Sequence, residues 1–149
     1  MQTADIAELF KRKLDNKEFT IDRTGCKTIE LIGASFEADK PSIFGTPNEE
    51  YINKEIQWYD SCSLNINDLG DPPPTQWKMS ASPDGYINSN YGYLIYGRDN
   101  HDQYQQCFEE LLRNPNSRRA SMIYTRPSMW NDYNAGGKND FVCTNSVTY

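Results

Sequence analysis

The stretch that decides the fold runs from Pro115 to Tyr149 and reads PNSRRASMIYTRPSMWNDYNAGGKNDFVCTNSVTY. It predicts two strands, Ala120 to Thr125 and Phe141 to Tyr149, joined by a polar loop that contains glycine. The pair Arg118–Arg119 stands just before the first strand, and Cys143 stands near the start of the second. A thiol and a doubly cationic anion site are the parts needed for covalent chemistry on a phosphorylated substrate.

Length and charge narrow the class of protein. A chain of 149 residues is the size of one domain, so we expect residues 1–149 to form a single domain. The net charge of -6 and the isoelectric point near 4.7 argue against a broad surface for nucleic acid or anionic membranes. No apolar run is long enough to span a membrane. A local basic pocket built from Arg23, Arg118 and Arg119 is compatible with this charge.

The cysteines give no metal-binding pattern. They are widely spaced, form no CxxC pair and stand at Cys26, Cys62, Cys107 and Cys143. With His101 as the single histidine, the sequence predicts no metal site. The N-terminal segment MQTADIAELFKRKL is amphipathic and charged, unlike a secretory leader. We therefore expect a cytoplasmic protein with reduced cysteines.

Four segments carry a clear secondary-structure pattern. They are a helix capped by Thr3, a strand at 27–35, a helix from Asn48 to about Tyr59, and a helix from Asp99 or Asn100 to Arg113. These helices and strands follow one another without a regular alternation. The pattern therefore predicts an α+β fold.

Glu55 is the most unusual residue of the second helix. It falls on the same helical face as Ile52, Ile56 and Tyr59. Burial of a carboxylate on such a face costs several kcal/mol unless the group is paired. Glu55 is therefore a structural ion-pair partner, a residue at the edge of the apolar face, or a functional group, and the spacing alone leaves these alternatives open.

The other candidate residues have ordinary structural explanations when each is taken alone. Arg23 stands beside a glycine turn, as a solvated loop arginine would. A single tryptophan such as Trp77 is usually a core residue, and a tyrosine in the setting of Tyr91 is most often structural. A cysteine in a strand, such as Cys143, is most often an inert core residue.

Several segments, taken in order, resemble one protein family. They are FTIDRTGCKTIELIGASF, EEYINKEIQWYDS, INSNYGYLIYG, SRRASMIYTRPSM and NDFVCTN. Together they resemble the thymidylate synthase superfamily, and they are most similar to the phage deoxycytidylate (dCMP) hydroxymethylases within it. The resemblance implies a mixed sheet with packed helices. It also implies that this chain forms the N-terminal portion of that fold, because the family continues well past Tyr149.

The resemblance assigns roles to individual residues. Cys143, in the CTN motif, stands at the family's nucleophile position, and Asn145 stands beside it as a substrate-binding residue. Tyr91 is implied to lie in the active site near the nucleophile. Glu55 is implied to organise water and proton transfer near the pyrimidine, and with Trp77 it borders the folate site.

The arginines are assigned to the nucleotide phosphate. Arginine offers bidentate hydrogen bonds that match phosphate oxygens. In the family, the basic residue at the place of Arg23 reaches this phosphate. The pair Arg118–Arg119 reaches across a dimer interface to the partner's nucleotide, so the resemblance implies a symmetric homodimer with shared sites.

The implied chemistry is the transfer of a one-carbon unit to a pyrimidine. A thiolate adds to C6 of the ring, which makes C5 a carbon nucleophile toward methylenetetrahydrofolate. A hydroxymethylase then adds water to the exocyclic methylene group, whereas a thymidylate synthase transfers a hydride from the folate. The overall resemblance, including NDFVCTN in place of the PPCH typical of thymidylate synthases, predicts hydroxymethylation of dCMP. Methylation of dUMP and a non-catalytic interaction protein that retains the fold are the alternatives.

Overall fold

The computed structural model describes the chain apart from Arg23, residues 133–134 and residues 139–141. It divides into two compact units, Met1–Glu49 and Glu50–Tyr149, which are described separately below. Helices and short antiparallel strands occur in both units, so the predicted α+β class is confirmed. Within the described residues, no helix combines the length and the apolar character needed to cross a membrane.

The first unit begins with helix α1 (Thr3–Asp15), as predicted. The residue before the helix is Gln2 rather than Thr3, and the backbone N–H of Gln2 donates to the Asp5 carboxylate at 2.7 Å. Thr3 instead donates its backbone N–H to Asp39 at 2.9 Å. The side chain of Ile6, a residue of α1, is buried because it lies on the apolar face of the helix.

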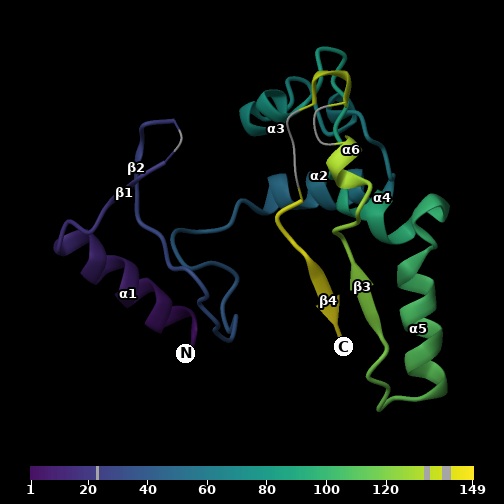
Figure 1. The fold of residues 1–149 in the computed structure, drawn as a ribbon, viewed down its shortest axis with the longest axis horizontal. Helices are drawn as coiled ribbons and strands as arrows, with labels where there is room; N and C mark the ends of the chain where they lie inside the picture. The colour runs from purple at the N-terminus through teal and green to yellow at the C-terminus, as the bar shows by residue number, and fades with distance from the viewer. Residues whose placement is uncertain (23, 133–134, 139–141) are drawn as a thin grey trace. The chain divides into compact units, whose positions relative to one another are not determined.

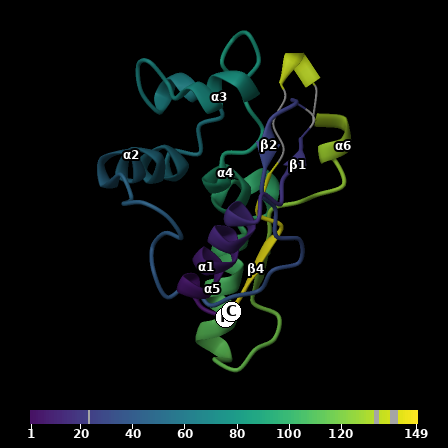
Figure 2. The ribbon, with the colours of Figure 1, turned by 90° about the vertical axis from the view of Figure 1, so that its left-hand side faces the viewer.

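A β-hairpin with strands of two residues each follows α1, in place of the longer strand predicted at 27–35. Strands β1 (Thr20–Ile21) and β2 (Lys27–Thr28) pair antiparallel, and they lie beyond the C-terminal end of α1 (Figures 1 and 2). The alternating pattern continues past Thr28, but Gly33 adopts a left-handed φ of 69° and Ile32 is 93% exposed. Strand β2 ends at Thr28, and the left-handed Gly33 would interrupt any extended run before Ser35, so the prediction of a strand at 27–35 was wrong.

Helix α2 (Glu49–Asp60) opens the second unit and confirms the helix predicted after Asn48. Its buried face differs from the predicted one, because Ile56 is 50% exposed whereas Trp58 is 2% exposed. The larger apolar surface of Trp58 is buried in place of that of Ile56. The buried face of α2 is therefore rotated about the helix axis relative to the predicted face. Trp58 packs with three residues from the following segments, Ile66, Leu69 and Ile87. Those segments include a 3-10 turn (η1, Ile66–Asp68) and helix α3 (Thr75–Ser80).

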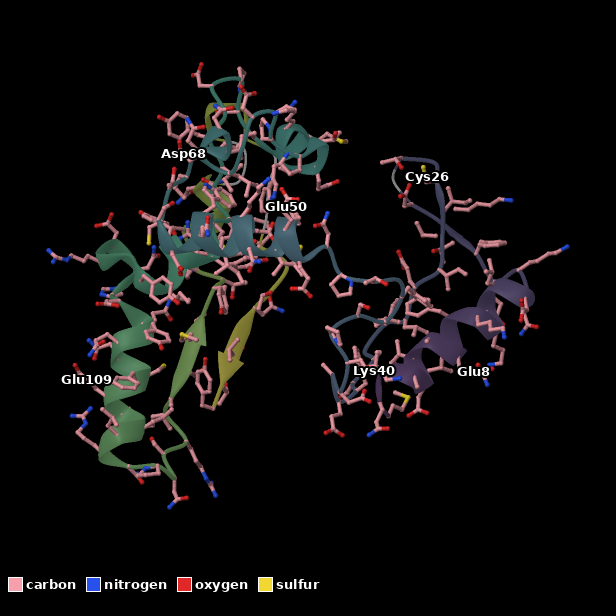
Figure 3. The ribbon with its side chains drawn as sticks, turned by 180° about the vertical axis from the view of Figure 1, so that it is seen from behind. Glu8, Cys26, Lys40, Glu50, Asp68 and Glu109 are labelled. Atoms are coloured by element: carbon pink, nitrogen blue, oxygen red, sulfur yellow. The ribbon has the colours of Figure 1, made fainter. Side chains whose placement is uncertain are left out.

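Two further helices precede the sheet of this unit. Helix α4 (Tyr91–Tyr96) is followed by a 3-10 turn (η2, Arg98–Asn100) and helix α5 (Gln103–Arg113). Helix α5 starts later than the predicted Asp99 or Asn100, because His101 and Asp102 adopt left-handed φ angles of 68° and 46°. Cys107 is buried on one side of α5, while the labelled Glu109 points away from the strands (Figure 3).

The predicted pair of strands forms, but both strands are shorter than expected. Strand β3 (Ser121–Ile123) pairs antiparallel with β4 (Ser146–Thr148), with Met122 opposite Val147, and α5 runs beside β3 (Figure 1). Between them come helix α6 (Met129–Asp132) and a 3-10 turn (η3, Ala135–Gly137). Cys143 precedes β4 and is therefore not a strand residue, while Phe141 lies outside the described residues.

The ladder ends where two donors share one acceptor. The backbone N–H groups of Tyr124 and Thr125 both donate to the Asn145 carbonyl, at 2.9 and 3.4 Å. Regular pairing cannot continue past this shared acceptor, so Cys143 and Thr144 are released from the sheet. The Cys143 backbone is thereby left to contact groups outside the two strands.

Candidate active site

The Glu55 carboxylate is the centre of a polar network on α2. The Tyr51 hydroxyl donates to Glu55 Oε1 at 2.7 Å, and residues four apart lie on one helical face. The Trp77 indole N–H, from α3, donates to the Tyr51 oxygen at 3.1 Å and to Glu55 Oε1 at 3.3 Å. Glu55 is thus half-buried, and both of these hydrogen-bond partners, Tyr51 and Trp77, are neutral donors.

Tyr59 extends this network toward α4. Burial, followed by the negative charge of Glu55, raises the pKa of Tyr59 well above its ordinary value, so its phenol stays protonated. The Tyr59 ring packs edge-on against the Tyr91 ring, with centroids 5.7 Å apart. Tyr91 packs in the same way against Tyr124, at 5.3 Å.

Tyr91 contacts the backbone of the predicted nucleophile. Its hydroxyl oxygen accepts the Cys143 N–H at 3.1 Å and the Thr144 N–H at 3.4 Å. Two amide donors on one phenol oxygen fix the Tyr91 hydroxyl beside the segment that carries the thiol. Cys143 itself is exposed.

Asn90 holds α4 in place for this contact. It is fully buried, and its side-chain amide donates to the Trp58 and Ser63 carbonyls at 3.1 and 2.8 Å. Its side-chain oxygen accepts the Tyr93 N–H at 2.8 Å, which caps the N-terminus of α4. The end of α2 and the start of α4 are therefore joined through one side chain.

The structure thus gathers four of the predicted site residues into one region. Glu55, Trp77, Tyr91 and Cys143 come from α2, α3, α4 and the segment before β4. Tyr51 and Tyr59 belong to the same region, although the sequence analysis gave neither of them a role in the site. Their signal is their spacing, since they stand four residues before and four residues after Glu55 on one helix.

The predicted phosphate-binding pair lies elsewhere in the chain. Arg118 and Arg119 precede β3, at the end of the β3–β4 ladder opposite to Cys143. The three residue pairs of the ladder, which span roughly 7 Å at about 3.3 Å per residue, lie between Arg119 and Cys143. One chain therefore does not bring the arginine pair and the thiol together. Arg23 lies outside the described residues, and Asn145 is exposed.

Arg119 is held by an ion pair within its own unit. Its Nη2 and Nε atoms lie 2.8 and 3.2 Å from Glu110 Oε1 on α5. Hydrogen bonds from the Ser117 hydroxyl and from Arg119 lower the pKa of Glu110, which keeps it an anion. The Arg119 side chain is nevertheless 80% exposed, so much of its guanidinium is open to a further anion.

The described residues include no cluster of side chains that could bind a metal ion. No group of three or more His, Cys, Asp or Glu side chains there is arranged to hold a metal ion. The site built from Glu55, Tyr91 and Cys143 instead offers a carboxylate, phenols and a thiol. That set suits nucleophilic and proton-transfer chemistry on an organic substrate.

These features and the sequence place the chain in a class: it belongs to the thymidylate synthase family, whose model matches residues 5–135. More particularly, it is 55% identical over 136 residues to the deoxycytidylate 5-hydroxymethyltransferases of phages T4 and T2, covering 91% of this chain. The thymidylate synthase of Francisella philomiragia is 29% identical over 124 residues, covering 78% of this chain and 43% of that protein. The resemblance inferred from the sequence is confirmed. The chain spans 55% of the length of the phage relatives.

Proposed function

We propose that the full-length protein that contains this chain hydroxymethylates dCMP at C5 and produces 5-hydroxymethyl-dCMP. The observation that carries the proposal is the 55% identity to phage deoxycytidylate 5-hydroxymethyltransferases over 91% of the chain. Identity to a thymidylate synthase is lower, at 29% over 78% of the chain. The substrate is therefore dCMP rather than dUMP, and the proposed compartment is the cytoplasm of the infected cell.

Cys143 supplies the nucleophile in this proposal. Its thiolate adds to C6 of the pyrimidine, and the electron pair of the C5–C6 double bond becomes available at C5. C5 then bonds to the methylene carbon of methylenetetrahydrofolate. Loss of the C5 proton and of the folate amine leaves an exocyclic methylene group on the ring. The contact between Tyr91 and the Cys143 amide at 3.1 Å supports a fixed position for this segment.

Glu55 serves the final step. Water adds to the exocyclic methylene carbon, the C5–C6 double bond re-forms, and the thiolate of Cys143 leaves C6. A base must take the proton of the water, and a half-buried carboxylate held by two neutral donors suits that role. Glu55 therefore orients the water and accepts its proton.

Trp77 borders the folate in this proposal. Its indole N–H donates to Tyr51 and Glu55, and its ring packs against Trp58 with centroids 5.2 Å apart, so a ligand would meet the part of the ring that this packing leaves exposed. An indole face suits stacking against a flat heterocycle such as a pterin. Methylenetetrahydrofolate is thus the expected co-substrate, and Glu55 and Trp77 are the residues expected to lie beside it.

The phosphate is bound by arginines from both subunits of a homodimer. Arg118 and Arg119 lie beyond the end of the β3–β4 ladder that is opposite to the thiol of their own chain. This separation supports a role at the partner's nucleotide rather than at their own. Arg23 completes the phosphate site, and Asn145 contacts the nucleotide beside Cys143.

The test is an assay of the full-length protein with dCMP, tetrahydrofolate and labelled formaldehyde. We expect label in 5-hydroxymethyl-dCMP, its loss in Cys143→Ala, and its retention in the control Cys26→Ala, since Cys26 is an exposed cysteine of the first unit. A preference for dUMP with formation of a methyl group would favour a thymidylate synthase. An absence of both products, with the protein folded and dimeric, would favour a non-catalytic interaction protein.

A further inference from the structure

Tyr51 occupies a defined place in the network around Glu55. An indole N–H can only donate, so the 3.1 Å contact makes the Tyr51 oxygen an acceptor from Trp77. The Tyr51 hydroxyl hydrogen then points to Glu55 Oε1 at 2.7 Å. The network therefore has one direction, from Trp77 through Tyr51 to Glu55.

The Tyr51 phenol keeps its proton at neutral pH. Burial, followed by the hydrogen bond to Glu55, raises the pKa of Tyr51 above its ordinary value of 10. A phenol that stays neutral remains a donor while Glu55 is ionised. A hydrogen bond to a charged acceptor is stronger and more directional than one between neutral groups.

We propose that Tyr51 is a positioning residue: together with the Trp77 indole it fixes one oxygen of Glu55, so that the carboxylate faces the water of the final step. The inference rests on the proposed function. It assigns Tyr51 no contact with the substrate. Without the phenol, the carboxylate rotates about its terminal torsion, which is broad for glutamate, and spends less time aimed at the water.

The test is Tyr51→Phe in the full-length protein, which removes the hydroxyl and keeps the ring. We expect kcat for hydroxymethylation to fall about tenfold to a hundredfold, with the KM for dCMP within about twofold of the parent value. Tyr104→Phe is the matched control, because Tyr104 lies on α5 and packs on Tyr96, away from Glu55. That control is expected to retain the parent kcat.

A second comparison separates positioning from a purely structural role. If Tyr51 acts through Glu55, Tyr51→Phe lowers kcat by less than about twofold when Glu55→Gln is already present. Trp77→Phe removes the other donor to the same oxygen and is expected to show the same dependence on Glu55. This second variant keeps the inference testable if Tyr51→Phe does not fold.

The outcomes divide clearly. If the parent is active and Tyr51→Phe keeps full activity, the positioning role alone is overturned. The same holds if Tyr51→Phe lowers kcat equally in the parent and in Glu55→Gln. A rise in the KM for dCMP at unchanged kcat overturns it as well, since it indicates direct binding. A parent that makes no hydroxymethyl product overturns the proposed function and this inference with it.

Discussion

Gly92 offers a quantitative test of how α2 and α4 are packed. A Cβ atom placed on Gly92 would lie 1.7 Å from the Tyr59 carbonyl oxygen, 2.4 Å from its carbonyl carbon and 2.9 Å from its Cα. All three neighbours are backbone atoms, which cannot turn aside as the end of a side chain can. Gly92→Ala therefore forces the start of α4 away from the end of α2 by more than an ångström before the contact reaches 3.0 Å.

The expected loss of stability follows from two opposing effects. Overpacking usually costs about 1–3 kcal/mol, and a contact with rigid backbone belongs at the upper end of that range. Alanine has the better helix propensity by about 1 kcal/mol. We therefore expect Gly92→Ala to lower the free energy of unfolding by about 2 kcal/mol.

Urea denaturation of the full-length protein measures this change. An unchanged m value would show that the parent and Gly92→Ala expose the same amount of surface on unfolding. Gly45→Ala is the control: space around Gly45 is open, and its φ of 70° adds only the backbone penalty of about 1 kcal/mol. Because Tyr91 adjoins Gly92, we also expect kcat to fall in Gly92→Ala. A change in stability below about 0.5 kcal/mol would refute the packing argument.

Four other predictions test the site. Incubation with 5-fluoro-dCMP and methylenetetrahydrofolate is expected to leave a covalent adduct on Cys143 by mass spectrometry, and an adduct on another cysteine would contradict its role. Arg119→Ala and Cys143→Ala subunits, each inactive alone, are expected to regain activity when mixed; no recovery would argue against shared sites. Glu55→Gln is expected to keep stability within about 1 kcal/mol yet to lower turnover at least roughly a hundredfold; the reverse pattern in thermal melts and rates would leave Glu55 a structural residue. Hydrogen bonds from Ser117 and then Arg119 lower the pKa of Glu110, so its stabilising effect is present above its ordinary pKa of 4.5 and is lost as the pH falls through the lowered value. The difference in melting temperature between the parent and Glu110→Gln should therefore shrink below pH 4.5, and a difference that stays constant with pH would count against this linkage.

The local patterns predicted helices better than they predicted strands or faces. The helix after Asn48 forms, because its spacing and its flanking residues agree with one another. Its buried face was misjudged, since periodicity cannot tell whether Ile56 or Trp58 finds the closer partners. The strand predicted to Ser35 ends at Thr28, because alternation does not supply the neighbouring strand that a ladder needs.

The site shows a similar division between local and long-range information. The spacing of Glu55 on an apolar face indicated an unusual carboxylate, and the structure gives it two neutral donors. The contact between Tyr91 and the Cys143 amide joins residues far apart in the chain, so no local pattern could predict it. Only the family resemblance placed these two residues together.

The buried side-chain amide of Asn90 restricts the motion of α4 relative to α2 and the substitutions that position 90 can accept. Its donors and its acceptor are all engaged, with α2, the following loop and α4. Aspartate would set an anion against two carbonyl oxygens, and glutamine is one methylene too long for the same three bonds. A sliding motion of α4 along α2 would break these bonds together. The backbone segments that carry Glu55 and Tyr91 are therefore coupled through the side chain of one buried residue.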